Sequence, residues 1–341
     1  MKIIIDMLHP AHVHFFKNFI KIMVKKNHEI YVTSRDKEVT NFLLKKYKIN
    51  SLSISSIGND LFSLGFELLI RNSKFLGIAQ KIKPDLLMGI MGPTIATVGK
   101  ILKIPSFVFY DSEFAKMTNN FVYPLATKVI TPSCYKNYIG DKHITYNGFQ
   151  ELAYLHPNYF KPDPSIKEFL GLGKNEVYFI LRLVGWKASH DIGHKGLSLP
   201  HVRDLIKKLE DYGHVFVSSE RPIINKKYQL KISPEKFHSL LYYAEMYIGE
   251  GITMASESAL LGVPSVLISP LVGNIGTLEN LESYGLANNF SESDKALEKI
   301  TNLLGVSDLK KRWQLKRDKM LTEKVDVTKF MVDLVEGFEQ K

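Results

Sequence analysis

The residues best suited to bind a phosphate group lie in the stretch 249–264. An apolar run ends in a Gly-Glu-Gly turn, and a short helix is expected to begin at Thr253, acting as N-cap, and to stop at Gly262. A strand, a glycine turn and a new helix N-terminus bring together free backbone N–H groups and the positive end of a helix dipole. The stretch therefore predicts a phosphate site lined by Gly251, Thr253 and Ser256, unless the glycines only form the turn.

An acidic residue, Glu257, lies one helical turn further on. A carboxylate facing a phosphate would repel it, whereas a carboxylate accepts hydrogen bonds well from the paired hydroxyls of a ribose. The same stretch therefore offers groups for both the phosphate and the sugar of a nucleotide.

Candidate acid–base residues follow two strands of the first half. His12 lies where the first loop meets the first helix, and an imidazole at a helix N-terminus has a lowered pKa, which suits a general base. The alternative is that His12 only caps the helix. Asp111 and Glu113 follow another strand and could bind an acceptor substrate or act as base in place of His12.

Three histidines, His9, His12 and His14, raise the question of a metal site, because zinc favours histidine ligands. Pro10 stiffens the loop, helical geometry turns His14 away from His12, and no Asp-x-Asp pair of the kind that holds Mg²⁺ is found. We therefore expect no metal, and we expect backbone N–H groups and cationic side chains to neutralise charge. His9 remains a candidate for substrate binding.

Polar residues also follow the strands expected in the second half. Arg182 lies within an apolar strand, where a charge without a partner is costly, so it should pair with a buried acid or face a cleft. Polar residues after a strand can reach a phosphate or a transferred sugar. The binding candidates of this kind are Lys187, Ser189, His190 and Ser219, although Ser219 fits a plain polar turn equally well.

A regular alternation of short apolar strands and helices positions these residues. The alternation is interrupted by a stretch with three prolines and begins again near residue 177. Units of this size argue for doubly wound parallel sheets, which bind ligands beyond the carboxyl ends of their strands. One such rim is expected to carry His9, His12, Asp111 and Glu113.

With 341 residues, 45% of them hydrophobic, the chain can bury two cores of ordinary domain size. Its net charge of +10 favours an anionic partner. No nucleic-acid motif is recognisable, which leaves nucleotide phosphates, an anionic membrane surface or a merely solubilising surface. The single cysteine, Cys134, excludes an internal disulfide and a thiolate metal cage, and no stretch approaches ~20 apolar residues. We expect a cytoplasmic protein that can attach to the inner face of the membrane.

The pattern Gly251-x-Thr253-x-x-Ser256-Glu257-x-Ala259-x-x-Gly262-x-Pro264 resembles the nucleotide-sugar signature of GT-B glycosyltransferases. It is most similar to that of the transferase that adds N-acetylglucosamine to the lipid-linked peptidoglycan precursor. In that family the loop and helix hold the UDP diphosphate, and the glutamate binds ribose. The resemblance also implies that Asn274 and Asn280 contact the donor sugar. His12 matches a His-Val pair in that family's first loop, although the glycines of that loop are missing here.

Nearly the whole chain resembles domain-of-unknown-function family 354, which is similar to GT-B enzymes and to UDP-N-acetylglucosamine 2-epimerases. The segments that carry this resemblance are His9–Asn18, Thr33–Lys37, Gly148–Pro157 and Arg182–Asp191. It implies an α/β, GT-B-like fold of two Rossmann-like, doubly wound parallel-sheet domains facing a cleft. The expected parts are an acceptor domain at 1–148, a linker at 149–165, a nucleotide-sugar domain at 166–320, and a C-terminal helix at 321–341 that docks on the first domain through Phe330–Phe338.

The leading hypothesis is a UDP-sugar-dependent, inverting, metal-independent glycosyltransferase of surface polysaccharide or glycolipid assembly. It would use a glycan or lipid-linked acceptor and no cofactor beyond the UDP-sugar substrate. His12 would deprotonate the acceptor, while the helix at Thr253 and the side chain of Lys187 stabilise the departing UDP. One alternative is a UDP-N-acetylglucosamine 2-epimerase or nucleotide-sugar hydrolase with acid–base groups from Asp111, Glu113 and Glu220. A non-catalytic nucleotide-sugar-binding protein is the other.

Overall fold

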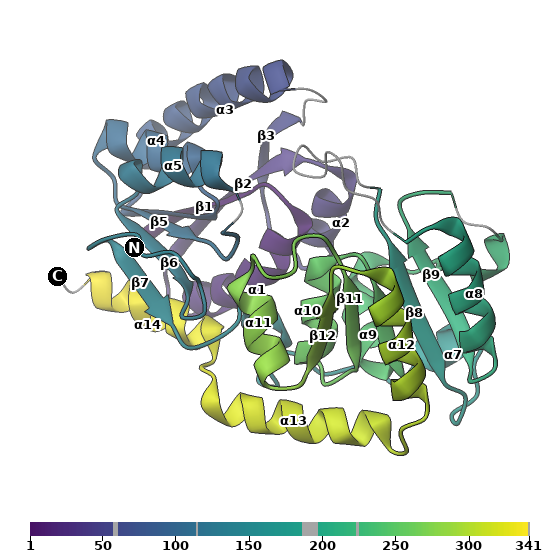
Figure 1. The fold of residues 1–341 in the computed structure, drawn as a ribbon. Coiled ribbons are helices and arrows are strands. Elements are labelled where there is room, and N and C mark those ends of the chain that lie inside the picture. The colour runs from purple at the N-terminus through teal and green to yellow at the C-terminus, as the bar shows by residue number, and fades with distance from the viewer. Residues whose placement is uncertain (57–60, 114, 186–196, 223–224, 340–341) are drawn as a thin grey trace. The chain divides into compact units, whose positions relative to one another are not determined.

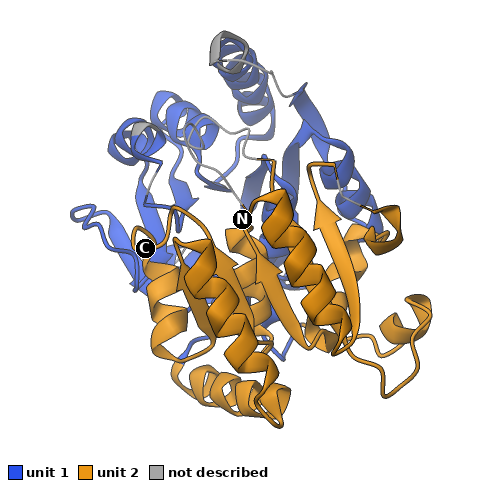
Figure 2. Cartoon of the chain, turned by 45° about the vertical axis from the view of Figure 1, so that its right-hand side comes forward, with its two compact units in different colours: residues 1–159, 324–341 blue, residues 160–323 orange. Residues whose placement is uncertain are grey.

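The computed structural model describes residues 1–56, 61–113, 115–185, 197–222 and 225–339, without the side chains of 61–64, 117 and 339. The chain forms two compact units, one of residues 1–159 with 324–341 and one of residues 160–323 (Figure 2). The sequence predicts the two boundaries between these units within 149–165 and at 320–321.

The first unit is built on a seven-stranded, fully parallel sheet (Figure 1). In spatial order its strands are β3 (Leu52–Ser56), β2 (Glu29–Asp36), β1 (Lys2–Met7), β4 (Leu86–Ile90), β5 (Ser106–Phe109), β6 (Lys128–Pro132) and β7 (His143–Tyr146). Its helices are α1 (Pro10–Lys25), α2 (Glu38–Lys46), α3 (Leu61–Ile82), α4 (Pro93–Leu102), α5 (Lys116–Leu125), α6 (Leu152–Leu155) and α14 (Val327–Glu339). The strand order reverses between β1 and β4, the kind of position where open parallel sheets bind ligands.

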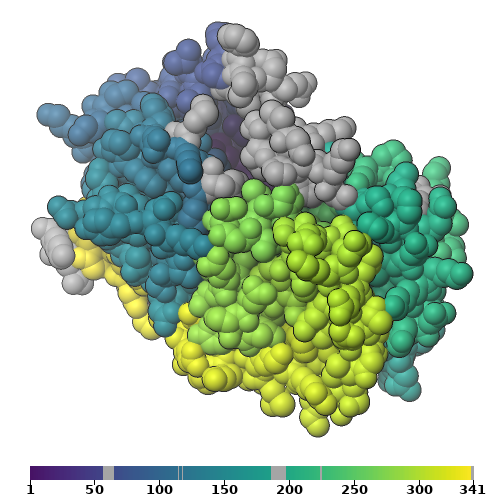
Figure 3. All heavy atoms as spheres, viewed as in Figure 1, coloured from purple at the N-terminus to yellow at the C-terminus, as the bar shows by residue number. Residues whose placement is uncertain are grey.

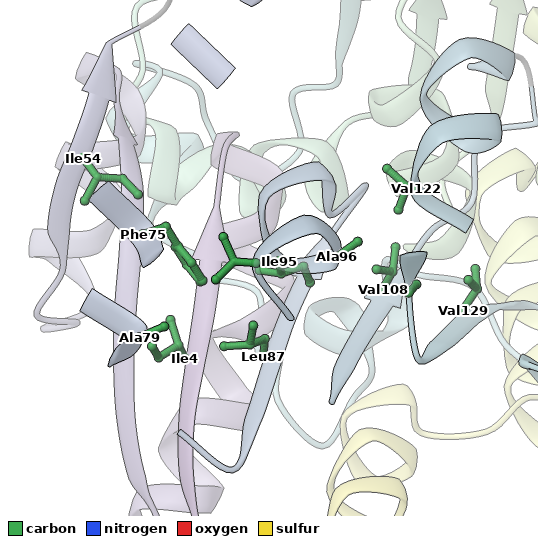
Figure 4. Close-up of a cluster of buried hydrophobic side chains, with 12 residues drawn as sticks. Ile4, Ile54, Phe75, Ala79, Leu87, Ile95, Ala96, Val108, Val122 and Val129 are labelled. Atoms are coloured by element: carbon green, nitrogen blue, oxygen red, sulfur yellow. The ribbon is translucent and has the colours of Figure 1, made fainter. Parts of the chain in front are cut away.

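The two faces of this sheet carry different helices. On one face, strand residues such as Ile4 and Val108 pack with Phe75 of α3 and Ile95 of α4 in a buried cluster (Figure 4). The next residue of β5, Phe109, points the other way, and its ring lies 5.4 Å from that of Phe15 in α1. Successive side chains of a strand alternate between the two faces of the sheet. Because helices cover both faces, both sets of side chains are buried, which explains the continuously apolar strands seen in the sequence.

The C-terminal helix α14 belongs to the first unit. The ring of Phe338 lies 5.0 Å from that of Phe107, and the ring of Phe330 lies 5.1 Å from that of Tyr146. The hydroxyl of Thr328 donates to the carbonyl of Ala153 at 2.8 Å. The helix is amphipathic, and these ring contacts cover its apolar side.

The second unit contains a five-stranded parallel sheet whose order reverses between β10 and β8. In spatial order its strands are β12 (Ala287–Phe290), β11 (Ser265–Ile268), β10 (Met246–Gly249), β8 (Tyr178–Leu183) and β9 (His214–Ser219). Its helices are α7 (Ile166–Phe169), α8 (Leu199–Glu210), η1 (Lys226–Tyr228), η2 (Pro234–Lys236), α9 (Phe237–Tyr243), α10 (Ile252–Leu260), α11 (Gly276–Ser283), α12 (Ser293–Leu304) and α13 (Leu309–Glu323). The outer side of α12 forms part of the molecular surface in Figure 3, while Ala296, Ile300 and Leu303 face the core.

The basic helix α13 holds the C-terminal ends of three other helices of this unit. Lys310 donates to the carbonyl of Ala244 after α9, Arg317 to that of Leu260 in α10, and Lys316 to that of Gly285 after α11, at 2.9 to 3.1 Å. Cations stabilise the last carbonyls of a helix because these carry the negative end of its dipole. Part of the chain's excess positive charge therefore has a structural role.

In the described part of the chain, no helix combines the length and the apolar character that a membrane span requires.

Candidate functional site

No side chain of the described residues caps the N-terminal turn of α10. The structure corrects one expectation here, because Gly251 rather than Thr253 is the N-cap, with φ −87° and ψ 111°, and α10 begins at Ile252. The first helical N–H with a backbone acceptor is that of Ala255, which donates to the carbonyl of Gly251 at 3.0 Å. No side chain in the described structure accepts from the N–H groups of residues 252–254, so the positive end of the helix is open to an anion.

The glycines before α10 allow a close approach of two strands. A Cβ atom at Gly249 would lie 2.7 Å from the carbonyl oxygen of Arg182 in β8, and one at Gly251 would lie 3.3 Å from the Arg182 Cγ. The hydroxyl of Tyr247 donates to the carbonyl of Gly251 at 3.0 Å and fixes the turn. Side chains at these glycines would crowd the reversal point between β8 and β10.

The predicted end of the helix is confirmed. Gly262 has a φ of +70°, and its N–H donates to the carbonyl of Ala259 while that of Val263 donates to Ser258, both at 2.9 Å. This is the Schellman arrangement, which favours glycine because the left-handed conformation strains other residues.

Glu257 and Ser256 lie on the inner side of α10 and are buried. An oxygen of the Glu257 carboxylate lies 3.0 Å from Nε2 of His238, whose ring is also buried. The sequence offered no signal for this histidine, which lies 19 residues earlier in α9. It fixes the direction in which the carboxylate points.

A second buried acid is Glu250, for which the sequence pattern indicates only a place in the glycine turn. Its side chain has no exposed surface and accepts from the backbone N–H groups of Val184 at 2.8 Å and Leu197 at 2.5 Å. It also pairs with Arg221 at 2.8 Å. These partners follow β8, precede α8 and follow β9, so one carboxylate holds three connecting segments at the carboxyl end of the sheet. Its only sequence signal was its place between two glycines.

The other candidates of the second unit have mixed surroundings. Arg182 pairs with Glu220 and donates to the hydroxyl of Ser218 at 2.8 Å, so its acidic partner is exposed rather than buried. Ser219 forms a local turn with Arg221. Asn274 is exposed, whereas Asn280 lies within α11 and its buried Oδ1 has no hydrogen-bond partner among the described residues. The remaining candidates, which lie outside the described residues, are Lys187, Ser189 and His190.

In the first unit, His9 and His12 are bound to the backbone around the start of α1. His9 is the N-cap, and its Nδ1 accepts from the N–H of Ala11 at 3.2 Å. The Nδ1 of His12 accepts from the N–H of Leu8, also at 3.2 Å. A backbone N–H can only donate, so Nδ1 of His12 carries the lone pair and the neutral ring carries its proton on Nε2.

The surroundings of His12 also keep its ring uncharged. Burial, followed by the neighbouring His9, Arg35 and Arg71, lowers the pKa of His12 well below its usual value. In this state Nε2 is a hydrogen-bond donor, and no described residue accepts from it. For His12 to act as the expected general base, the bond from Leu8 would have to break so that the proton could move to Nδ1. The structure therefore favours a role as a neutral donor.

This arrangement predicts a spectrum for His12. In ¹⁵N-labelled protein, long-range ¹H–¹⁵N correlations should give the Nε2–H tautomer for His12 at pH 7, and the ring should still be neutral at pH 6.5, the ordinary pKa of histidine, because the pKa of His12 is lowered. A midpoint near 6.5 for His12, or a proton on Nδ1, would contradict the assignment.

Asp111 is the acid–base candidate with the most favourable pKa. It follows β5, and burial together with the nearby Glu113 raises its pKa from 3.8 to about 6, against the opposing hydrogen bond from the Ser112 hydroxyl at 3.0 Å. Glu113 is itself buried and accepts from the N–H of Lys136 at 3.2 Å. A carboxylate with a pKa close to the working pH is well suited to accept a proton.

Asp111 and His12 lie on the same rim of the sheet. Only β4 separates β1 from β5, so the ends of the two strands are about 10 Å apart. His14 does not join them, because its ring contacts Tyr47 and Tyr154. The described residues include no group of three or more His, Cys, Asp or Glu arranged to hold a metal ion.

Residues 1–339 match the model of a protein family described as "Protein of unknown function (DUF354)". The chain belongs to this family. A curated relative of this DUF354 protein, uncharacterized protein MJ0665 of Methanocaldococcus jannaschii, is 27% identical over 280 residues, which span 78% of this chain and 81% of that protein.

Solved structures show the fold of this DUF354 protein. It is similar to MnaA of S. aureus in a complex with UDP, at a TM-score of 0.71 and 11% identity over 99% of this chain and 97% of that one. It is similar to UDP-GlcNAc 2-epimerase from Neisseria meningitidis bound to UDP-GlcNAc, at 0.68 and 12% over 99% and 100%. It is also similar to the glycosyltransferase SsfS6 of Streptomyces sp. SF2575, at 0.62 and 13% over 98% and 99%. The predicted α/β, GT-B-like class with two Rossmann-like parallel sheets is confirmed.

Proposed function

We propose that this DUF354 protein is a UDP-sugar-dependent glycosyltransferase that inverts the anomeric carbon without a metal ion. The observation that carries the proposal is the uncapped N-terminal turn of α10 at the reversal point of the second sheet. Free N–H groups at a helix N-terminus suit a diphosphate. The fold is shared with proteins solved with UDP or UDP-GlcNAc and with a glycosyltransferase.

The residues around α10 divide the work of binding the donor. The N–H groups of residues 252–254 and the Thr253 hydroxyl would hold the diphosphate, with Arg182 and Ser219 nearby in the chain's second unit. Glu257, directed by His238, would accept from the ribose hydroxyls, and Ser256 supports the same turn of the helix. Asn274 and Asn280 would contact the sugar, and Lys187, Ser189 and His190 remain expected donors to the β-phosphate.

In the first unit, we assign the role of base to Asp111. Its carboxylate would take the proton of an acceptor hydroxyl, and the hydroxyl oxygen would form a bond to the anomeric carbon. The bond from that carbon to the UDP oxygen breaks, and UDP leaves with the electron pair. A single displacement of this kind inverts the anomeric carbon. His12 and His9 would donate to oxygens of the acceptor or sugar, and the α10 turn would neutralise the charge that develops on UDP.

A second candidate is a nucleotide-sugar epimerase or hydrolase, favoured by the pair Asp111 and Glu113 and by the similarity to an epimerase. An epimerase or hydrolase needs no acceptor. The transferase of the leading proposal needs one, a glycan or a lipid-linked alcohol. A protein that binds nucleotide sugars without turnover is the third. NMR of the sugar with and without candidate acceptors separates the three, because only the transferase leaves the sugar unchanged until an acceptor is added.

The binding site itself can be tested with Thr253→Asp. Thr253 is exposed and is the second residue of α10, so the new carboxylate would stabilise the helix dipole but repel a diphosphate. We expect UDP to bind at least ten-fold more weakly in calorimetry, with thermal stability unchanged or slightly raised. Thr322→Asp on α13 makes the same charge change away from this turn and should bind UDP normally. Unchanged UDP binding in Thr253→Asp would place the nucleotide elsewhere.

A further inference from the structure

A buried charged network lies under the carboxyl ends of β1 and β2 in the first unit. Arg71 and Asp6 form an ion pair whose side chains are 1% and 3% exposed. The hydroxyl of Thr33 donates to the same Asp6 oxygen at 2.6 Å. Arg71 also donates to the Ser55 hydroxyl at 2.7 Å. Buried ion pairs are costly and seldom improve on an apolar core, so such a network suggests a purpose beyond stability.

The network ends on the side chain of Arg35. The hydroxyl of Ser55 donates to Glu67 at 2.8 Å, and the same Glu67 oxygen accepts from Nε of Arg35 at 2.7 Å. Glu67 is buried, whereas Arg35 is partly exposed. Because only Nε is engaged, the two terminal amino groups of the guanidinium have no acceptor among the described residues. The network therefore fixes Arg35 in one position and leaves its planar fork for a ligand.

Two further donors share histidine neighbours with Arg35, since Lys37 and Arg35 both lower the pKa of His9 and Arg35 also lowers that of His12. Lys37 follows on the same strand end, and its ammonium group has no acceptor in the described structure. The Nε2–H of His12 is the second, and the pKa of His12 is lowered, after burial, by positive neighbours that include Arg35. The nearby carboxylate of Asp36 is held by Asn41 at 2.6 Å. The neighbours that lower the pKa of His12 are His9, Arg35 and Arg71, and no carboxylate is among them, although Asp6 and Glu67 lie in the network below.

We propose that Arg35, Lys37 and the Nε2–H of His12 form a binding site for a phosphate group of the acceptor substrate. A planar guanidinium fork, a lysine and a neutral imidazole donor match the oxygens of a phosphate and demand no metal. The inference rests on the proposed transferase function, because it assigns the group to the second substrate. The phosphate would belong to a lipid carrier or to a phosphorylated glycan.

The test is calorimetric titration of the full chain with inorganic pyrophosphate, in the presence of saturating UDP and at constant ionic strength. We expect one equivalent to bind to the wild type and to bind at least ten-fold more weakly to Arg35→Gln and Lys37→Gln. Lys45→Gln, which removes an exposed lysine of α2, is the matched control and should bind as the wild type does. Lys37 has no described partner, so its variant remains informative if Arg35→Gln fails to fold because Glu67 loses its ion-pair partner.

Three further ligands identify the chemistry. Farnesyl phosphate binding better than glucose 1-phosphate would indicate a lipid carrier, and the reverse a phosphorylated glycan; both support the site. Glucuronate binding as well as either phosphate ligand would overturn the assignment to phosphate. Wild-type affinity for pyrophosphate in both variants would overturn the site itself. UDP titrations of the same variants keep the two proposals apart, since UDP should bind normally to each variant. A wild type that does not bind UDP would count only against the transferase.

Discussion

Asp111→Asn is expected to lose turnover while gaining stability above pH 6. The pKa of Asp111 is raised from 3.8 to about 6 in the folded protein, so the folded state holds this proton more tightly than the unfolded state. Below about pH 4 the residue is protonated in both states and carries no penalty. Between about pH 4 and pH 6 the unfolded state ionises while the folded state keeps its proton, so the penalty grows with pH and reaches about 3 kcal/mol above pH 6. Asparagine cannot ionise, so it removes this cost.

The same substitution removes the proposed base, and loss of a general base lowers kcat by about 10²- to 10⁴-fold. The measurements are urea unfolding at pH 4 and pH 8 and a turnover assay at pH 8. The stability difference between variant and wild type should be near zero at pH 4 and largest at pH 8. Asp141→Asn, at an exposed aspartate of the same unit, should change neither quantity. An Asp111→Asn protein that is active, or less stable than the wild type at pH 8, would contradict this account.

Glu250→Gln is expected to be the most destabilising conservative change in the second unit. The carboxylate of Glu250 is fully buried and accepts from two backbone N–H groups and from Arg221. An amide cannot accept at both ends, so at least one donor loses its partner and the guanidinium of Arg221 is left without its countercharge. Breaking a buried pair on one side costs about 3–5 kcal/mol. For a unit of this size the melting temperature should fall by roughly 10 °C.

Glu220→Gln is the matched control, because it also removes a carboxylate from an arginine, but the Glu220 side chain is 53% exposed. Exposed pairs contribute at most about 1 kcal/mol, so this variant should melt close to the wild type. Hydrogen exchange of peptides ending near Val184 and beginning near Leu197 gives a local readout. Both should exchange faster in Glu250→Gln only. Equal melting temperatures for the two variants would show that Glu250 does not hold these segments.

The amino-acid sequence by itself determined the fold class and the general place of the candidate site. Strand and helix periods are local properties, so the alternation of short apolar strands with amphipathic helices predicted two parallel sheets. Parallel sheets collect the residues that follow their strands on one rim, and this rule predicts that His12 and Asp111 share a rim, as the strand order β1-β4-β5 confirms. The glycine and proline pattern likewise fixed the end of α10 at Gly262.

Only the tertiary structure decided what the polar groups at these places are bound to. Arg71 meets Asp6 across 65 residues, and Glu250 meets the N–H of Leu197 across 53. No periodicity encodes such pairs, because they depend on which strands become neighbours. The proton position on His12 depends on the N–H of Leu8, and the pKa of Asp111 depends on burial by distant elements. Residue types are written in the sequence, whereas protonation and partners follow from packing, since both respond to solvent exposure and to the charges that the fold brings close.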